Sequence, residues 1–135
     1  MNMWLNGART SNDPFYPVDW FDNGWVDGLH LVKSKLSELV MPPASQVFVF
    51  MEPHERSIDD GYFRVANPVY AGPGWAWADL PSGRHNRVGN VSFADGHTEP
   101  VKWKSPKTFI RRDQSPKPGP DLQDLLRVQG WVPVE

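Results

Sequence analysis

Apolar and polar residues alternate most clearly between residues 84 and 104, and this pattern predicts a β-hairpin. The apolar positions of the segment are Val88, Val91, Phe93, Val101 and Trp103. Asp95-Gly96 stands between the two runs, and Asp-Gly is a strong signal for a two-residue turn of the primed type, which needs φ > 0 at both central residues. We expect this turn at the hairpin tip, with His97 directly after it and His85 before the first strand.

A continuous apolar run in residues 46–52, QVFVFME, predicts a second strand. Because residues 47–51 are all apolar, the run is typical of a central strand that is covered on both faces. Gly61 then permits a turn, and residues 62–65 are expected to begin another strand. The polar residues between this run and Gly61 are Glu52, His54, Glu55, Asp59 and Asp60.

The sequence predicts only short helices. Residues 121–129, DLQDLLRVQ, predict a C-terminal helix with Asp121 as its N-cap and Gly130 as its stop. In residues 29–41 the apolar spacing fits both a helix and a strand, and we expect a strand-like entry followed by a helical turn near residues 36–40.

The composition predicts long ordered loops around a small sheet. The chain contains 14 Pro, 11 Gly, 7 Trp and 7 Phe. Residues 1–28 are rich in turn residues and aromatic residues, so we expect an ordered aromatic loop region there, while residues 66–84 and 105–120 are predicted loops, the second of them linker-like. The expected fold is one α+β domain over residues 1–135. It has an antiparallel sheet of roughly four to six strands, with its core in residues 46–104, and little helix.

Charge and cysteine content exclude several classes of protein. The formal net charge is −2, so no broad basic surface supports nucleic-acid binding, and the lysines and arginines between residues 102 and 117 are interpreted as a solvated edge. The absence of cysteine excludes disulfides and thiolate metal sites. The sequence has neither an apolar run long enough to span a membrane nor the basic start and apolar block of a secretory signal at its N-terminus.

Three blocks of the sequence resemble one family. His85 is separated by nine residues from Asp95-Gly96, and this spacing resembles the signature of the prepilin-type processing-associated H-X9-DG proteins, which are pseudopilin-like proteins of the type II secretion and type IV pilin superfamily. The segment VFVFMEPHERSIDDGYF (47–63) is similar to an earlier block of that family, and residues 78–108 are similar to its C-terminal block. The first residues, MNMWLNG (1–7), resemble the segment that precedes both.

The chain departs from the family pattern in two respects. Family members begin with a basic leader and a long apolar helix, so we expect this chain to correspond to their C-terminal portion, a head without the N-terminal pilin helix. Met51 stands where the family tends to have an Asp beside Glu52. Without the pilin helix, one face of the sheet is expected to be apolar and exposed unless another chain or a local segment covers it, which predicts self-association or a partner that docks a helix in a groove.

The resemblance implies a non-enzymatic structural and assembly module of a secretion or pilus-type apparatus, in the periplasm or on the outside of a bacterial cell envelope. Its partners would be other pseudopilin subunits or further copies of the chain, and membrane contact would require the helix that this sequence lacks. The residues of the structural motif are His85, Asp95, Gly96, Asp60, Gly61 and Trp103. The alternative function is a cell-surface module that binds carbohydrate or calcium.

Metal binding is the most specific chemical hypothesis that the sequence supports. Carboxylates are the ligands that Ca²⁺ prefers, but each Asp-Gly pair is also explained by turn geometry, and the spacing is not that of an EF-hand. The candidate ligands are Glu52, Asp59, Asp60 and Asp95. A transition-metal site would use His54, His85 and His97 with Glu52, although no pair of these shows helical ligand spacing.

Catalysis has weaker support. His85 and Asp95 could form a triad with Ser57, Ser82 or Ser92, but the sequence has no Gly-x-Ser-x-Gly nucleophile elbow. The favoured role of His85 is structural, as a hydrogen-bond partner of the hairpin backbone or of Asp95. Trp75, Trp77 and His97 are candidate contacts for a sugar, although a role of the tryptophans as lids over the sheet is favoured.

Overall fold

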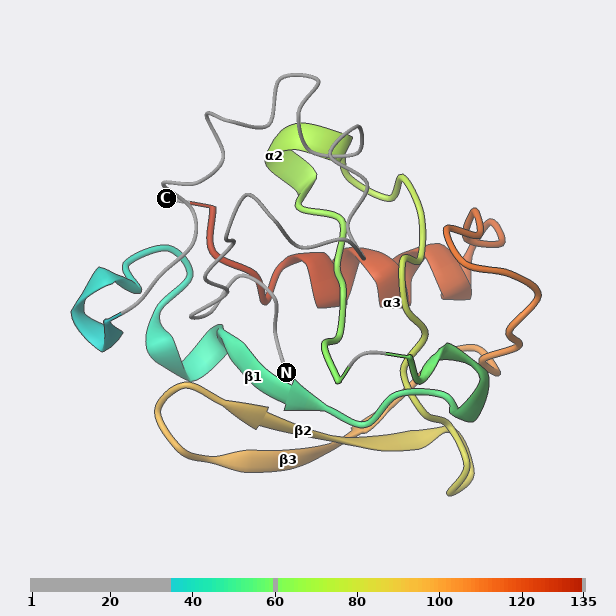
Figure 1. Cartoon of the computed structure of the whole chain (residues 1–135), viewed down its shortest axis with the longest axis horizontal. Helices are drawn as coiled ribbons and strands as arrows, with labels where there is room; N and C mark the ends of the chain where they lie inside the picture. Colours follow the sequence, from blue (N-terminus) through green and yellow to red (C-terminus); the bar gives the residue numbers. More distant parts are fainter. Residues whose placement is uncertain (1–34, 60, 135) are drawn as a thin grey trace.

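The computed structural model describes residues 35–59 and 61–134. They form a small α+β fold in which a three-stranded antiparallel sheet lies beside one longer helix (Figure 1). The strands are β1 (Phe48–Met51), β2 (Val88–Phe93) and β3 (Thr98–Lys102), in the order β1-β2-β3. The helices are α2 (Pro68–Ala71) and α3 (Pro120–Gln129), and single 3-10 turns lie at Leu36–Glu38, Ala44–Gln46 and Glu55–Ser57. Three strands in this part of the chain are fewer than the sequence predicts.

The hairpin between β2 and β3 lies where the alternation predicts it, but its turn differs from the prediction. Gly96 N–H donates to the Phe93 carbonyl at 3.0 Å, and Phe93 N–H donates to the His97 carbonyl at 2.9 Å. Gly96 has φ of 95°, whereas Asp95 is not among the residues with positive φ. The connection is therefore a three-residue loop that closes with a left-handed glycine, which is the next commonest hairpin geometry.

Within residues 35–59 and 61–134, β1 is an edge strand of the sheet and not the central strand that the sequence predicts. β2 is the central strand and pairs with both β1 and β3. The register of β1 shifts between Phe48 and Phe50, and Phe50 is 58% exposed while Phe48 is fully buried. A bulge of this kind re-aims one side chain, which explains why a continuous apolar run does not mean burial on both faces here.

The inner face of the sheet packs against α3 and a layer of large side chains. Leu125 and Val128 of α3 belong to the same buried cluster as Phe48, Val91 and Val101 of the strands. The segment after α3 continues this cover, because Phe48 N–H donates to the Trp131 carbonyl. The other large buried side chains are Phe63, Trp77, Leu80 and Trp103.

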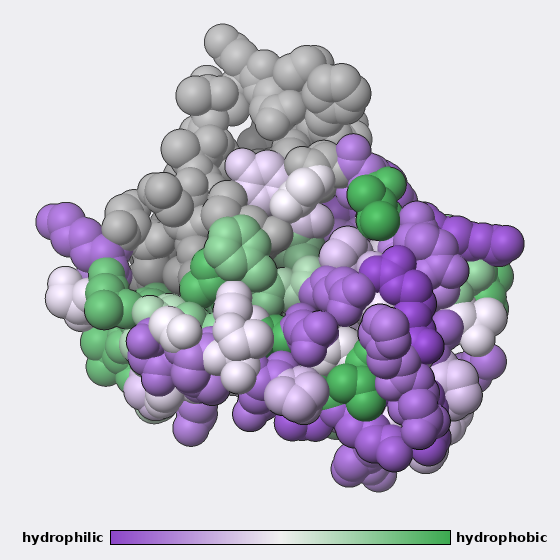
Figure 2. Space-filling view, turned by 90° about the horizontal axis from the view of Figure 1, so that it is seen from below, coloured by the Kyte–Doolittle hydropathy of each residue, from purple (hydrophilic) through white to green (hydrophobic). Residues whose placement is uncertain are grey.

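The outer face of the sheet is mainly polar, so the expected exposed apolar sheet face is not present in the described residues. The registered pairs Ser92–Thr98 and Asn90–Pro100 lie on it, and Lys102 extends it. Phe50 is its one large exposed apolar side chain among the described residues. Figure 2 likewise shows one side of the molecule as largely hydrophilic, with hydrophobic residues in separate patches.

The remaining elements agree in part with the sequence. α3 covers the predicted C-terminal helix and ends at Gly130, but its N-cap is Gly119, and Asp121 lies inside the first turn. Residues 62–65 are outside any strand. The expected aromatic loop in residues 1–28, the start of the 29–41 segment and Asp60 lie outside the described residues. No helix in residues 35–59 and 61–134 is long and apolar enough to cross a membrane.

Candidate functional site

The two ends of the H-X9-DG spacing are far apart in the structure. Strand β2 fills most of the interval, with His85 before its first residue and Asp95 after its last. Six residues of strand extend about 20 Å at the usual rise of about 3.3 Å per residue. The His85 side chain is exposed, and the hydrogen bond found there joins its backbone carbonyl to Val88 N–H. His85 therefore does not orient Asp95, which corrects that expectation.

Asp95 is instead paired with His97 across the turn. Asp95 Oδ1 accepts a hydrogen bond from His97 N–H at 3.1 Å and lies 2.6 Å from Nδ1 of the same residue. The side-chain hydrogen bond from His97, supported by the backbone one, lowers the pKa of Asp95 below its ordinary value. The His97 ring stacks on Phe93 at 4.5 Å. Both polar groups therefore stabilise the turn.

The candidate calcium ligands are distributed over two ends of β1. Glu52 follows the last residue of β1 and pairs with Arg84 at 2.5 Å, while Asp95 lies at the other end, where Ala94 N–H donates to the Val47 carbonyl. Asp59 pairs with Arg112 and lies 3.9 Å from Arg64. The described residues contain no group of three or more histidine, cysteine or carboxylate side chains that could hold a metal ion.

The candidate histidines and serines are also separated. His54 follows β1, where its Nδ1 accepts a hydrogen bond from Arg56 N–H and its ring stacks against Phe109. His97 lies at the opposite end of that strand, at the hairpin tip. Ser57 Oγ donates to the Leu80 carbonyl inside the protein. The structure therefore brings together neither a histidine metal site nor a serine triad from these residues.

The candidate ligand-contact tryptophans differ in exposure. Trp75 is 47% exposed, whereas Trp77 is 2% exposed and Trp103 is buried beside it in the core. Trp103 Nε1 donates to the Ser82 carbonyl at 2.7 Å, which fixes the indole between the hairpin and the preceding loop. Trp77 and Trp103 thus have the role of core side chains, and a flat aromatic platform does not form from Trp75 and Trp77.

Lys107, in the predicted linker, is a buried cation that the sequence analysis did not predict. The Lys107 side chain is 1% exposed, and its amino group lies 2.9 Å from Asp121 Oδ1 and 2.7 Å from Asp124 Oδ2. Asp121 and Asp124 come from the first half of α3, so the segment 105–120 is fastened to that helix rather than being a free linker. The only sequence signal is a pair of acidic residues about one helical turn apart, Asp121 and Asp124, of which the sequence predicts Asp121 to be the N-cap of the helix.

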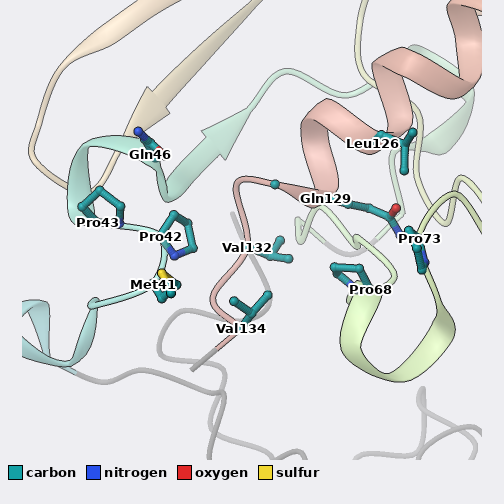
Figure 3. A pocket seen from close by; sticks show the side chains of 11 residues that line it. Met41, Pro42, Pro43, Gln46, Pro68, Pro73, Leu126, Gln129, Val132 and Val134 are labelled. Carbon is teal, nitrogen blue, oxygen red and sulfur yellow. The ribbon is translucent and has the colours of Figure 1, made fainter.

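An apolar groove lies between the C-terminal segment, α2 and the turn before β1 (Figure 3). Its volume is about 430 Å³. None of its lining residues is charged, and the apolar ones are Met41, Pro42, Pro43, Pro68, Pro73, Leu126, Val132 and Val134. Gln129 lies at its wall and is held by three hydrogen bonds, in which its side chain accepts from Gly74 N–H and donates to the carbonyls of Ala66 and Gly72. The groove could receive another molecule by apolar contact.

Comparison with known proteins adds no relative to this picture. No protein-family model matches the chain, and neither a curated protein nor a solved structure matches it.

Proposed function

We propose that this chain is a non-enzymatic pseudopilin-like module that serves structure and assembly in a secretion or pilus-type apparatus of a bacterial envelope. The proposal rests on the sequence blocks that resemble the H-X9-DG family and on how those blocks are arranged. Its partners are other pilin-type subunits, and its location is the periplasm or the cell exterior.

One observation carries the proposal: the two main blocks of the resemblance, 47–63 and 78–108, fold as one unit. β1 of the first block pairs with β2 of the second, and the contact continues beyond the strands. His54 N–H donates to the Leu80 carbonyl at 2.8 Å, and Ser82 N–H donates to the Glu52 carbonyl at 2.7 Å. Residues that resemble a family in two separate segments therefore support each other through backbone hydrogen bonds, as expected of a fold signature.

The motif glycines support a structural role for the signature. Gly96 and Gly61 have φ of 95° and 79°, values that L side chains rarely adopt. Each therefore permits a turn within its block. Asp95, the polar motif residue beside Gly96, makes turn contacts with His97, which supports a structural role for it.

The surface best suited to assembly is the apolar groove beside Leu126 and Val132. Because its lining carries no charge, the partner segment it would accept is apolar, and the resemblance names the class: the apolar helix of a pilin-type subunit. Met41, which lines the groove, is 52% exposed and so is available to a partner at its mouth.

Site-specific photocrosslinking in cells of the source organism tests this function. A photoreactive residue at Met41 is expected to give an adduct with a pilin-type subunit, identified by mass spectrometry. The matched control is Ile110, which is 69% exposed but lies outside the groove, and it should give no such adduct. Equal labelling from both positions, or no adduct with a pilin-type subunit from Met41, would contradict the proposal.

A further inference from the structure

Lys107 holds its amino group inside the protein between two carboxylates on α3. The Nζ atom lies 2.7 Å from Asp124 Oδ2 and 2.9 Å from Asp121 Oδ1, and a third contact reaches Ser105 Oγ at 3.3 Å. The side chains of Lys107 and Asp124 are each 1% exposed. A lysine this deeply buried is unusual, and its nitrogen is already within reach of a carboxyl group from a different segment of the chain.

Two indole rings close the site against water. Lys107 Nζ lies 4.8 Å from the centre of the Trp77 ring and 5.6 Å from that of Trp103. Both tryptophans are themselves buried. The rings exclude water from the space around the amino group, so the nitrogen faces the two carboxyl groups without competing solvent.

The two carboxylates are held differently. Asp124 Oδ1 accepts a hydrogen bond from Lys104 N–H at 3.0 Å, and its Oδ2 accepts one from Ser105 N–H at 3.1 Å. Two fixed backbone donors on one carboxyl group are suited to stabilise an oxyanion that forms when its carbon is attacked. Asp121 Oδ1 accepts a hydrogen bond from the Lys107 amino group at 2.9 Å, and Asp121 Oδ2 accepts one from Lys117 N–H at 2.9 Å. The Asp121 carboxylate is therefore placed to take a proton from the lysine nitrogen.

We propose that Lys107 and Asp124 condense to an intramolecular isopeptide bond, with Asp121 as the proton carrier. A proton passes from the ammonium to the Asp124 carboxylate, which leaves a neutral amine and a carboxylic acid. The nitrogen attacks Asp124 Cγ, and the oxyanion that forms is held by Lys104 N–H. Asp121 removes a proton from the nitrogen and delivers it to the departing hydroxyl, the Cγ–Oδ2 bond breaks, and one water molecule leaves.

The reaction needs no oxidant and no cofactor, and its product joins the segment 105–120 covalently to α3. The chain has no cysteine, so this link would supply the kind of covalent constraint that a disulfide gives to other proteins. The inference does not depend on the proposed assembly function, because it follows from the positions of Lys107, Asp121 and Asp124 alone.

Mass spectrometry of the purified, folded chain tests the link directly. The expected mass is lower than the sequence mass by one water. Trypsin should fail to cut after Lys107, and the peptide 105–111 should be found joined to the peptide 113–127. A folded chain that keeps the full sequence mass after prolonged incubation at neutral pH, with normal cleavage after Lys107, would overturn the proposal.

Succinimide formation at an Asp-Gly pair also removes one water, so it must be separated from the proposed link. At Asp95-Gly96 the loss would map to a single peptide and would reverse in mild alkali, whereas an amide between two peptides would persist. Chain held in denaturant from synthesis onward should show no cross-linked peptide, because the link requires the folded arrangement.

Variants assign the roles of the three side chains. Lys107→Met should abolish the link, and Asp124→Asn should form the same bond with loss of ammonia instead of water. Asp121→Asn should slow the reaction about a hundredfold, the order of magnitude of general acid–base catalysis. An unchanged rate in folded Asp121→Asn would refute its role as proton carrier, while the wild-type mass decides the bond itself even if a variant fails to fold.

Discussion

His85 and Asp95 lie at opposite ends of strand β2, with the whole strand between them. The spacing of the motif therefore sets the length of a strand and the position of the turn that ends it, and it does not bring two polar side chains together. Asp95 takes its partner from the other side of the turn, where His97 Nδ1 lies 2.6 Å from its carboxylate.

Replacing His85 should have little effect on stability. Its side chain is exposed, so we expect His85→Ala to change the free energy of unfolding by no more than about 0.5 kcal/mol, as is usual for surface positions. Asp95→Ala is the matched comparison. It removes both hydrogen bonds to His97 and should lower the urea midpoint further. A larger loss from His85→Ala than from Asp95→Ala would show that the imidazole has a structural partner.

Replacing Gly96 or Gly89 by alanine should lower the stability of the fold, for a different physical reason at each position. A Cβ at Gly96 meets nothing within 4 Å, so Gly96→Ala should cost only the left-handed backbone strain, about 1–2 kcal/mol. At Gly89 a Cβ would lie 2.6 Å from the Ser82 carbonyl oxygen and 3.2 Å from Trp103 Nε1, which are joined by a hydrogen bond. Gly89→Ala should therefore be the more destabilising of the two in thermal unfolding, and the reverse order would contradict this account of the hairpin.

Calcium should not stabilise the folded chain through the predicted carboxylates. Glu52 pairs with Arg84, and Asp95 lies at the other end of β1, so these groups do not converge on one ion. We expect the same Tm in a calcium buffer and in a chelator. A Tm that rises with calcium concentration, and that loses this dependence in Glu52→Gln, would restore the calcium hypothesis.

Local patterns predict the local elements well. The sequence predicts the hairpin and α3 because alternation and leucine spacing indicate which face of a short segment is buried. The sequence does not predict the position of β1 in the sheet, because an apolar run indicates that a strand is buried but not which strands pair with it. The edge of β1 that faces away from β2 is partly covered by the segment after α3, whose Trp131 carbonyl accepts the Phe48 N–H, and that contact joins positions far apart in the sequence.

The candidate site was less predictable because its parts come from distant segments. Lys107 stands in a stretch rich in proline and lysine, which on composition alone suggests a solvated linker. Its burial depends on Trp77 and Trp103, and on two aspartates whose obvious local role is at a helix start. The apolar groove likewise combines three separate segments, residues 41–46, 68–73 and 126–134, so no single stretch of sequence carries its pattern.

Removing the buried cation should be the most damaging change to a charged residue that the structure suggests. Lys107→Met keeps the length and the apolar stem of the side chain but leaves Asp121 and Asp124 without their cation, and breaking a buried pair in this way costs about 3–5 kcal/mol. Lys102→Met, at an exposed position of β3, is the control and should stay within about 0.5 kcal/mol of the wild type. Denaturant unfolding of the three proteins at neutral pH measures both values, with the wild-type chain taken before the Lys107–Asp124 amide has formed, as its full sequence mass shows.

The loss of unfolding free energy caused by Lys107→Met should depend on pH. Burial by itself raises the pKa of Asp121, but hydrogen bonds from the Lys107 amino group and from Lys117 N–H outweigh it and hold the pKa below its ordinary value. A lowered pKa in the folded state contributes stability that is present above the unfolded pKa of about 3.9 and is lost as the pH falls through the folded value. In Lys107→Met the hydrogen bond and charge that lower the pKa of Asp121 are gone, so this pKa should rise and protonation of Asp121 should stabilise the variant as the pH falls. The difference in unfolding free energy between wild type and variant is therefore expected to be widest near pH 7 and to narrow toward pH 4. A difference that stays constant over this range would show that Lys107 acts through packing on Trp77 and Trp103 rather than through its charge.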